Sequence, residues 1–299
     1  MISERLFSII TRTNRRAIGN IYDIAKLANV SIATVSRVVN NSPKVSPKTK
    51  EKVLAVMKEN QYTPNAFARG LGLGSMKTVG IICPNIDDIY MAKAVSSLEQ
   101  NLHAHGYDCI LGCSGFKQEE KEDYVRLLLS KKIDTLILVG STYAGNGKDE
   151  SDTDYIREAA EQVSIFMINA KVSGDNIYCT YADDFQATYE VTKAFIRRGK
   201  EKILFMYDSE SYSARQKMAG YEAALQDAGY PIRGNLKFKT KNDIEYTRDM
   251  LLEYNRTLDF DSVLATEDGI AIGAVKYAKI KGLAIPEELA VVGYNNSIL

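Results

Sequence analysis

Residues 21–40 read IYDIAKLANVSIATVSRVVN, and this stretch decides how the first part of the chain folds. Apolar or small residues recur with the i, i+3, i+4 spacing of one buried helical face, at Ile21, Ile24, Ala25, Leu27 and Ala28. Ser31 is a good N-cap for a second short helix. That helix would turn Val35, Val38 and Val39 inward. Two short helices about three residues apart are typical of a helix-turn-helix, although a helical hairpin without a nucleic-acid role has the same pattern.

The second helix of a helix-turn-helix enters the major groove, where its N-terminal residues face base edges. We therefore expect an outward-facing set of side chains on that helix, namely Ile32, Ala33, Thr34 and Arg37. A third helix is predicted from Pro47 to about Glu59, because Ser46 can cap it and proline suits its first position. Its packing residues would be Val53, Leu54, Val56 and Met57. Its lysines, together with Arg37 and Lys44, indicate phosphate binding more than an ordinary solvated face.

The net charge of zero hides a segregation of charge along the chain. Residues 1–77 contain 13 Lys and Arg against 4 Asp and Glu, whereas the remaining residues contain 25 against 34. A basic first part joined to an acidic body predicts a polyanionic partner for the first part alone. Residues 1–19 carry four arginines without periodicity, and we interpret them as an atypical basic extension.

Several classes of protein are disfavoured by composition. No apolar run approaches the roughly 20 residues that span a bilayer, and residues 1–19 lack a secretory h-region. The four cysteines lie in no metal-binding spacing, which favours reduced thiols. We therefore expect a cytoplasmic protein that binds no membrane, metal or cofactor.

Residues 65–77 separate the basic part from the body. Pro64 ends the preceding helix and Asn65 can cap a new one, but Gly70, Gly72 and Gly74 would stop it within two turns. So short a helix is marginal in water by itself. A hinge that folds on DNA and an ordinary interdomain linker both fit this pattern.

From Thr78 onward, apolar strands alternate with amphipathic helices. The predicted strands are Thr78–Cys83, Tyr107–Leu111, Thr135–Val139, Ser164–Ile168, Ile203–Tyr207, Ser262–Ala265 and Leu289–Val292. Helices are predicted near 90–105, 118–131, 153–162, 184–198, 212–228, 243–255 and 269–281. The alternation predicts two doubly wound parallel sheets, with a changeover near Asn169–Tyr181.

Ligands of open α/β sheets bind beyond the carboxyl ends of the strands. This rule selects Asn85–Tyr90, Ser141, Asp208, Glu267, Asp268 and Tyr294–Asn296. Hydroxyls, amides, carboxylates and tyrosines around one cleft suit a polyol or sugar, which needs many hydrogen bonds and an apolar contact.

These motifs together resemble those of the LacI/GalR family of bacterial transcription regulators. In the first part the matching segments are Ile21–Ala25, Val30–Ser31, Thr34–Asn40 and Tyr62–Ala66. In the body they are Ser213–Arg215 with Gly220, Ala265–Asp268 and Val291–Tyr294. The resemblance runs from about residue 20 to the last residue.

The resemblance implies a fold and a domain organisation. It implies an all-α helix-turn-helix headpiece over residues 20–64, a hinge over 65–77 and a bilobal α/β body over 78–299, like a periplasmic binding protein. The N-lobe would span about 78–170 and the C-lobe about 171–299. Relatives normally continue for some tens of residues beyond the position of Leu299, so we expect a C-terminally truncated form.

The resemblance also implies roles for single residues. Base readers would be Ile32, Ala33 and Arg37, with Leu71 as a minor-groove wedge. The other DNA-binding candidates are Tyr22, Ser31, Thr34, Ser36, Asn40, Asn65 and Ala68. The effector-binding candidates are Tyr90, Ser141, Arg215, Asp268 and Asn295, the last standing where an aspartate is more usual. Asp87-Asp88-Ile89-Tyr90 replaces a more usual Ser-Asn-Pro-aromatic segment.

The function that the resemblance implies is that of a homodimeric, operator-binding regulator, expected to be a repressor, controlled by a sugar-like effector. One alternative is a periplasmic-type sugar-binding protein, against which the basic headpiece and the lack of a signal segment argue. Another is an enzyme. The chain has no P-loop and no Gly-x-Ser-x-Gly elbow, and His103 and His105 have no evident catalytic partners. We therefore expect no enzymatic activity.

Overall fold

The headpiece of this computed structural model contains three short helices. The structure describes residues 20–63, 75–145, 150–254 and 259–299. In the headpiece these form α2 (Ile21–Leu27), α3 (Ile32–Val39) and α4 (Pro47–Glu59). The side chains of Ser31 and Ser46 cap α3 and α4, accepting from the backbone N–H groups three residues on. The predicted caps, and the bounds of the third helix, are therefore confirmed.

A small apolar core holds the three helices together. It is built from Ile24, Ala25, Ala28, Val35, Val38, Val53 and Met57. Two residues predicted to pack there do not. Leu27 is 58% exposed and Leu54 45% exposed. Each directly neighbours a core residue in sequence, and one residue turns about 100° around a helix, which carries both leucines out of the narrow buried stripe.

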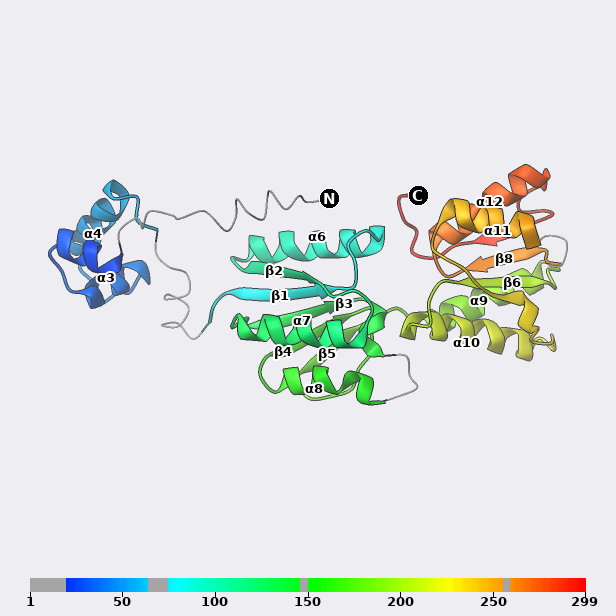
Figure 1. Cartoon of the computed structure of the whole chain (residues 1–299), viewed down its shortest axis with the longest axis horizontal. Coiled ribbons are helices and arrows are strands. Elements are labelled where there is room, and N and C mark those ends of the chain that lie inside the picture. Colours follow the sequence, from blue (N-terminus) through cyan, green and yellow to red (C-terminus); the bar gives the residue numbers. More distant parts are fainter. Residues whose placement is uncertain (1–19, 64–74, 146–149, 255–258) are drawn as a thin grey trace. The chain divides into compact units, whose positions relative to one another are not determined.

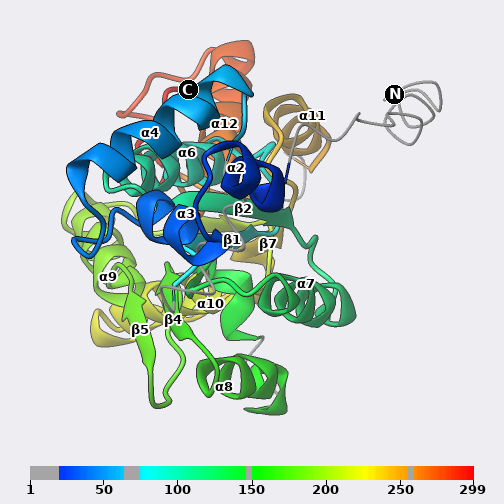
Figure 2. The same cartoon turned by 90° about the vertical axis from the view of Figure 1, so that its left-hand side faces the viewer.

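The first lobe of the body is a parallel sheet in the order β2-β1-β3-β4-β5. Its strands are β1 (Thr78–Cys83), β2 (Asp108–Cys113), β3 (Thr135–Val139), β4 (Ser164–Ile168) and β5 (Ile177–Thr180). One face packs on α6 (Ile89–Ala104), and the other on α7 (Gln118–Ser130) and α8 (Asp154–Ala160). Figures 1 and 2 show α6 on the opposite side of the sheet from α7 and α8. Short 3-10 turns, η1 (Ser141–Ala144) and η2 (Glu150–Thr153), follow β3.

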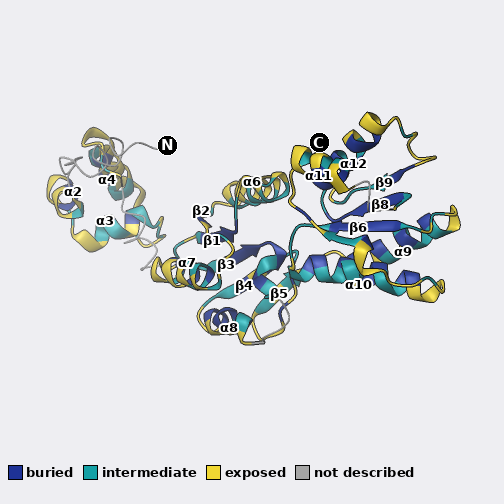
Figure 3. Cartoon of the chain, turned by 45° about the vertical axis from the view of Figure 1, so that its right-hand side comes forward, coloured by how far each residue is buried: buried dark blue, intermediate teal, exposed yellow. Residues whose placement is uncertain are grey.

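The second lobe is a parallel sheet in the order β7-β6-β8-β9. Its strands are β6 (Ile203–Tyr207), β7 (Lys237–Lys239), β8 (Ser262–Ala265) and β9 (Ala290–Val292). Helices α9 (Asp184–Arg197) and α10 (Tyr212–Asp227) cover one face, while α11 (Ile244–Tyr254) and α12 (Asp268–Lys281) cover the other. A 3-10 turn, η3 (Gly234–Leu236), leads into β7. Strands β6 and β8 are buried on both faces, as Figure 3 shows.

The predicted architecture of two doubly wound parallel sheets is confirmed, but two edge strands were not predicted. Strand β5 lies within the segment interpreted as the changeover, and it extends the first sheet to Thr180 rather than to about residue 170. Strand β7 was not predicted at all. Both are short and pair on one side only, so their sequences lack the apolar run of a central strand.

Some predictions concern residues outside the described part of the chain. These are the basic extension over residues 1–19 and the hinge residues Asn65, Ala68 and Leu71. Among the described residues, no helix is both long and apolar enough to cross a membrane.

Candidate DNA-binding face and effector cleft

The outward face of α3, the predicted recognition helix, carries the residues predicted to contact DNA bases. Ile32 is 41% exposed, and Ala33 and Arg37 are also exposed. On the neighbouring helix the Tyr22 side chain is 65% exposed. The described headpiece, residues 20–63, holds seven Lys or Arg against three Asp or Glu. An exposed helix face on a small basic domain is the arrangement that major-groove binding requires.

The other predicted headpiece contacts are partly engaged within the protein. Ser31 Oγ accepts the N–H of Thr34 at 3.1 Å and lies 2.9 Å from Thr34 Oγ1. Ser36 is half-buried, and Asn40 forms the C-cap of α3. Asn40 Oδ1 is buried without a hydrogen-bond partner in the described structure. Ser31 and Asn40 therefore cap the two ends of α3.

A cleft opens where the carboxyl ends of the two sheets meet in the body. It consists of three adjoining cavities of about 370, 450 and 50 Å³. Asp88 and Glu267 line all three, which makes them parts of one site. The smallest cavity lies deepest, among Ser213, Thr266 and Lys217, all of which are buried. The prediction from the carboxyl-end rule therefore locates this cleft.

Four of the five predicted effector residues line the cleft. Tyr90 comes from α6 and Ser141 from the turn after β3, in the first lobe. Asp268 opens α12, and its Oδ2 accepts the backbone N–H of Ser297 at 2.6 Å. Asn295 follows β9 and donates from Nδ2 to Glu267 Oε2 at 2.7 Å. The lobes thus contribute side chains to the same cavity.

The fifth residue, Arg215, does not line any of the three cavities. Its Nη1 donates to the carbonyl oxygen of Glu210 at 3.0 Å. Lys217, two positions on, reaches the deep cavity instead. Two residues turn about 200° around a helix, so these side chains leave α10 on opposite sides. A sequence signal for Lys217 existed, because it falls on the buried stripe of α10 marked by Ser213, Ala214 and Tyr221.

Lys217 is held in place by the second lobe. Its Nζ donates to Thr266 O at 3.1 Å and lies 3.7 Å from the centroid of the Tyr294 ring. The Tyr294 hydroxyl in turn donates to Asp184 Oδ1 at 2.5 Å. Burial lowers the pKa of Lys217, while Glu267, Asp184, Asp208 and Asp268 act in the opposite direction. A buried ammonium supported by carboxylates and an aromatic ring is a fixed point for a ligand.

Two carboxyl groups of the cleft, those of Glu267 and Asp208, are shifted toward their neutral forms. Burial raises the pKa of Glu267 to about 8, with Lys217 opposing and Asp208, Asp88 and Asp268 adding to the rise. Burial also raises the pKa of Asp208, again with Lys217 opposing. Perturbed groups gathered at one cleft are typical of a functional site.

The described residues contain no evident metal site. They contain no group of three or more His, Cys, Asp or Glu side chains arranged to hold a metal ion. The four cysteines are free thiols. His105 lies with Nδ1 at 2.7 Å from Asn101 O, at the end of α6. The cleft is lined by hydroxyls, amides, carboxyls and two buried lysines, Lys121 and Lys217.

Comparison with known proteins gives the same two-part division. A family model described as "Bacterial regulatory proteins, lacI family" matches residues 20–65. A second, described as "Periplasmic binding proteins and sugar binding domain of LacI family", matches residues 76–297. The chain belongs to the LacI family. It is a DNA-binding transcriptional regulator with an effector domain of the sugar-binding type.

Individual relatives span both parts of this LacI-family chain. An HTH-type transcriptional regulator of Lachnoclostridium phytofermentans is 47% identical, covering 94% of this chain and 84% of its own. Catabolite control protein A of Priestia megaterium is 31% identical, with 93% and 83% covered. A structure of the Lac repressor dimer bound to operator and an anti-inducer has the same fold, with a TM-score of 0.82, 23% identity and coverage of 94% and 84%.

Proposed function

We propose that this LacI-family regulator is a cytoplasmic homodimeric repressor that binds a near-palindromic operator and responds to a sugar-like effector. The observation that carries the proposal is the presence in one chain of an exposed recognition helix on a basic headpiece and a polar cleft between two lobes. Two copies of one headpiece require two half-sites, so operator symmetry follows from a dimer. We propose no enzymatic activity for the cleft.

The proposed DNA contacts begin with α3. Ile32, Ala33 and Arg37 are exposed and would face base edges, with the Arg37 guanidinium as the side chain able to make a bidentate contact to guanine. Tyr22, Ser31, Thr34, Ser36 and Asn40 would contact the DNA backbone and fix the docking angle. Asn65, Ala68 and Leu71 are proposed as hinge contacts on the family resemblance alone.

The proposed effector site is the cleft, with Tyr90, Ser141, Asp268 and Asn295 as ligands and Lys217 added to them. Because both lobes supply side chains, a ligand that bridges them favours one relative lobe orientation. Its effect on operator affinity then equals its preference between the two orientations. Arg215, held at the carbonyl oxygen of Glu210, is proposed only as a contact in another lobe orientation.

The first test is a salt titration of the purified protein on a palindromic duplex from its own promoter region, against a scrambled duplex. We expect operator binding to exceed scrambled binding by about a thousandfold or more. Arg37→Ala is expected to reduce that ratio by about 10- to 100-fold. The matched control is Lys58→Ala, which removes one positive charge from the exposed side of α4. It should weaken both duplexes alike and lower the salt slope by about one.

Equal binding of the operator and the scrambled duplex at every salt concentration would refute sequence-specific recognition by this headpiece. Discrimination that survives Arg37→Ala unchanged would leave the regulator proposal in place but remove Arg37 from the set of base readers.

A further inference from the structure

The charge lining the cleft is strongly unbalanced, and this bears on the class of effector under the function proposed above. The described lining contains nine acidic residues and two basic ones. The acidic residues are Asp87, Asp88, Asp152, Asp208, Glu210, Asp243, Glu245, Glu267 and Asp268. The basic residues are Lys121 and Lys217. A site for an anionic sugar would be expected to show the reverse balance.

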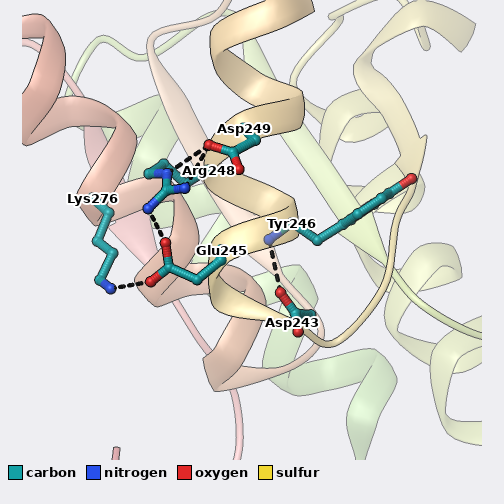
Figure 4. A network of polar contacts seen from close by, with 6 residues as sticks. All are labelled: Asp243, Glu245, Tyr246, Arg248, Asp249 and Lys276. Atoms are coloured by element: carbon teal, nitrogen blue, oxygen red, sulfur yellow. Dashed lines mark hydrogen bonds and ion pairs between the residues drawn. The ribbon is translucent and has the colours of Figure 1, made fainter.

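Some of these carboxylates already have cationic partners at the rim of the cleft. Glu245 is paired with both Arg248 and Lys276, as Figure 4 shows. Glu210 lies 3.3 Å from Lys239 Nζ. Asp243 is engaged with a backbone group, since its Oδ1 accepts the N–H of Tyr246 at 2.7 Å. Glu245 and Glu210 are therefore compensated by cations of the protein. The backbone hydrogen bond of Asp243, like those that Asp88 accepts from Met91 and Asp268 from Ser297, brings no positive charge to the carboxyl group.

The carboxylates that remain at the centre come from loops on both lobes. Asp88 follows β1, Asp208 follows β6, and Glu267 and Asp268 follow β8. Asp88, Asp208 and Glu267 line the same cavity of about 50 Å³. Among the described residues, Asn295 donates to Glu267 Oε2. The centre of the cleft therefore concentrates carboxyl groups, and a bound cation would favour their ionised forms.

The two lysines do not balance this charge. Lys121 is 5% exposed and donates to Thr142 O at 2.9 Å, at the outer end of the cleft. Lys217 is 3% exposed and donates to Thr266 O. One central ammonium faces four carboxyl groups, and burial penalises each uncompensated charge.

An independent feature shows that the deep cavity is built for a polar group. Ser213 Oγ and Thr266 Oγ1 both line it and are buried without a hydrogen-bond partner in the described structure. The residues are 4% and 2% exposed. A buried hydroxyl left unpaired costs about 1–3 kcal/mol. Two of them beside one cavity of about 50 Å³ therefore indicate that a ligand hydroxyl or amine completes the site.

We propose that the effector is a polyhydroxylated molecule that carries an ammonium group, an amino sugar. Its ammonium group faces Asp88, Asp208 and Glu267, and a hydroxyl of the same molecule pairs with Ser213 and Thr266 in the deep cavity. A phosphorylated sugar would bring negative charge against the same carboxylates. A divalent cation does not fit, because the described residues form no metal-ligand cluster.

The test is calorimetric titration of the full chain with matched sets of hexoses. The sets are glucose, glucosamine and glucose 6-phosphate, and their galactose and mannose counterparts. We expect at least one amino sugar to bind about tenfold or more tightly than its parent hexose, and the 6-phosphates to bind most weakly. Asp208→Asn should reduce the preference for the amino sugar about tenfold. The control Glu253→Gln, an exposed residue on α11 that does not line the cleft, should leave it unchanged.

Three outcomes overturn the proposal. These are a parent hexose that binds as tightly as its amino sugar, a phosphate that binds best, and binding by none of the three amino sugars. Operator affinity measured on the same samples separates this failure from failure of the proposed function. If a hexose or hexose phosphate changes operator affinity, the effector does not need an ammonium group, but the proposal that a sugar controls operator binding still holds. Loss of operator discrimination itself would refute the regulator proposal.

Discussion

At the scale of single residues, the cleft contains unpaired hydroxyls and buried carboxyl groups that lower the stability of the free protein but can bind a ligand. Thr266 and Ser213 have buried hydroxyls without partners among the described residues, and Glu267 and Asp208 have raised pKa values. Outside the cleft, the described part of the body has one other such hydroxyl, that of Tyr155. The buried Thr192 Oγ1, in contrast, donates to Thr188 O at 2.8 Å. Strain and unpaired groups of this kind collect at functional sites, where a ligand later compensates for them.

Thr266→Val tests this directly, because valine keeps the shape of threonine and removes only the unpaired hydroxyl. We expect the free energy of unfolding to stay level or to rise by about 1 kcal/mol, since no hydrogen bond is lost. Effector affinity should fall. The matched variant Thr192→Val removes a hydroxyl that is bonded and equally buried, and it should destabilise the body by about 1 kcal/mol. Equal losses of stability in urea unfolding of the two variants would contradict this account.

Glu267 gives the body a predictable pH dependence. Its carboxyl faces Asp88, Asp208, Asp268 and Lys217, and its folded pKa of about 8 lies above the ordinary value of 4.5. Between these values the folded state holds a proton that the unfolded state has released. Stability is therefore fully present below the unfolded pKa and is lost as the pH rises through the folded pKa.

Glu267→Gln should remove that loss. The variant and the native chain should melt together near pH 5. Near pH 9 the variant should melt about 10 °C or more higher, because a rise in pKa from 4.5 to about 8 corresponds to roughly 5 kcal/mol. The amide oxygen of glutamine can still accept from Asn295. Thermal unfolding across this range is the measurement, with Glu253→Gln as the exposed control. A variant that melts lower than the native chain at high pH would show that the ionised carboxylate stabilises the body.

At the scale of elements, the sequence predicted the strands and helices that have a regular apolar pattern. It did not predict the edge strands, whose formation depends on the strand beside them. The central strands and the long helices have continuous apolar runs or stripes, and they occur where predicted. Strands β5 and β7 pair on one side only. As edge strands they lack the continuous apolar run by which a central strand is predicted. The carboxyl-end rule located the cleft, because the direction of parallel strands fixes which loops meet. The rule could not predict whether Arg215 or Lys217 lines the cleft, because that depends on which side of α10 faces the cavity.

The contact between α9 and α10 is an element-scale feature with a clear weak point. A Cβ placed on Gly220 would lie 2.1 Å from Phe185 O and 2.4 Å from Thr188 Oγ1, so the helices could not keep their separation. We expect Gly220→Ala to destabilise the body by about 1–3 kcal/mol through overpacking. Gly234→Ala, where a Cβ would meet nothing within 4 Å, is the matched control. Chemical denaturation measures the stability of both variants. Similar midpoints would show that α9 and α10 can move apart to accommodate the added methyl group without loss of stability.

At the scale of the whole molecule, charge is divided between its two functions. Basic residues outnumber acidic ones before residue 78, by 13 to 4, and acidic residues outnumber basic ones after it, by 34 to 25. DNA therefore attracts the headpiece and repels the body, which keeps the effector cleft free of the polyanion that the headpiece binds. Communication between the two sites would then pass through the protein that links them.

Such communication is reciprocal, and this gives the strictest test of regulation. If an amino sugar weakens operator binding by some factor, operator DNA must weaken amino-sugar binding by the same factor, expected to be about 5- to 150-fold. Titrating the sugar into free protein and into protein saturated with operator measures the second factor, and titrating operator with and without sugar measures the first. Scrambled duplex at the same salt concentration is the control. Unequal factors would mean that the sugar releases DNA by some route other than the cleft, since two sites linked through one protein cannot differ.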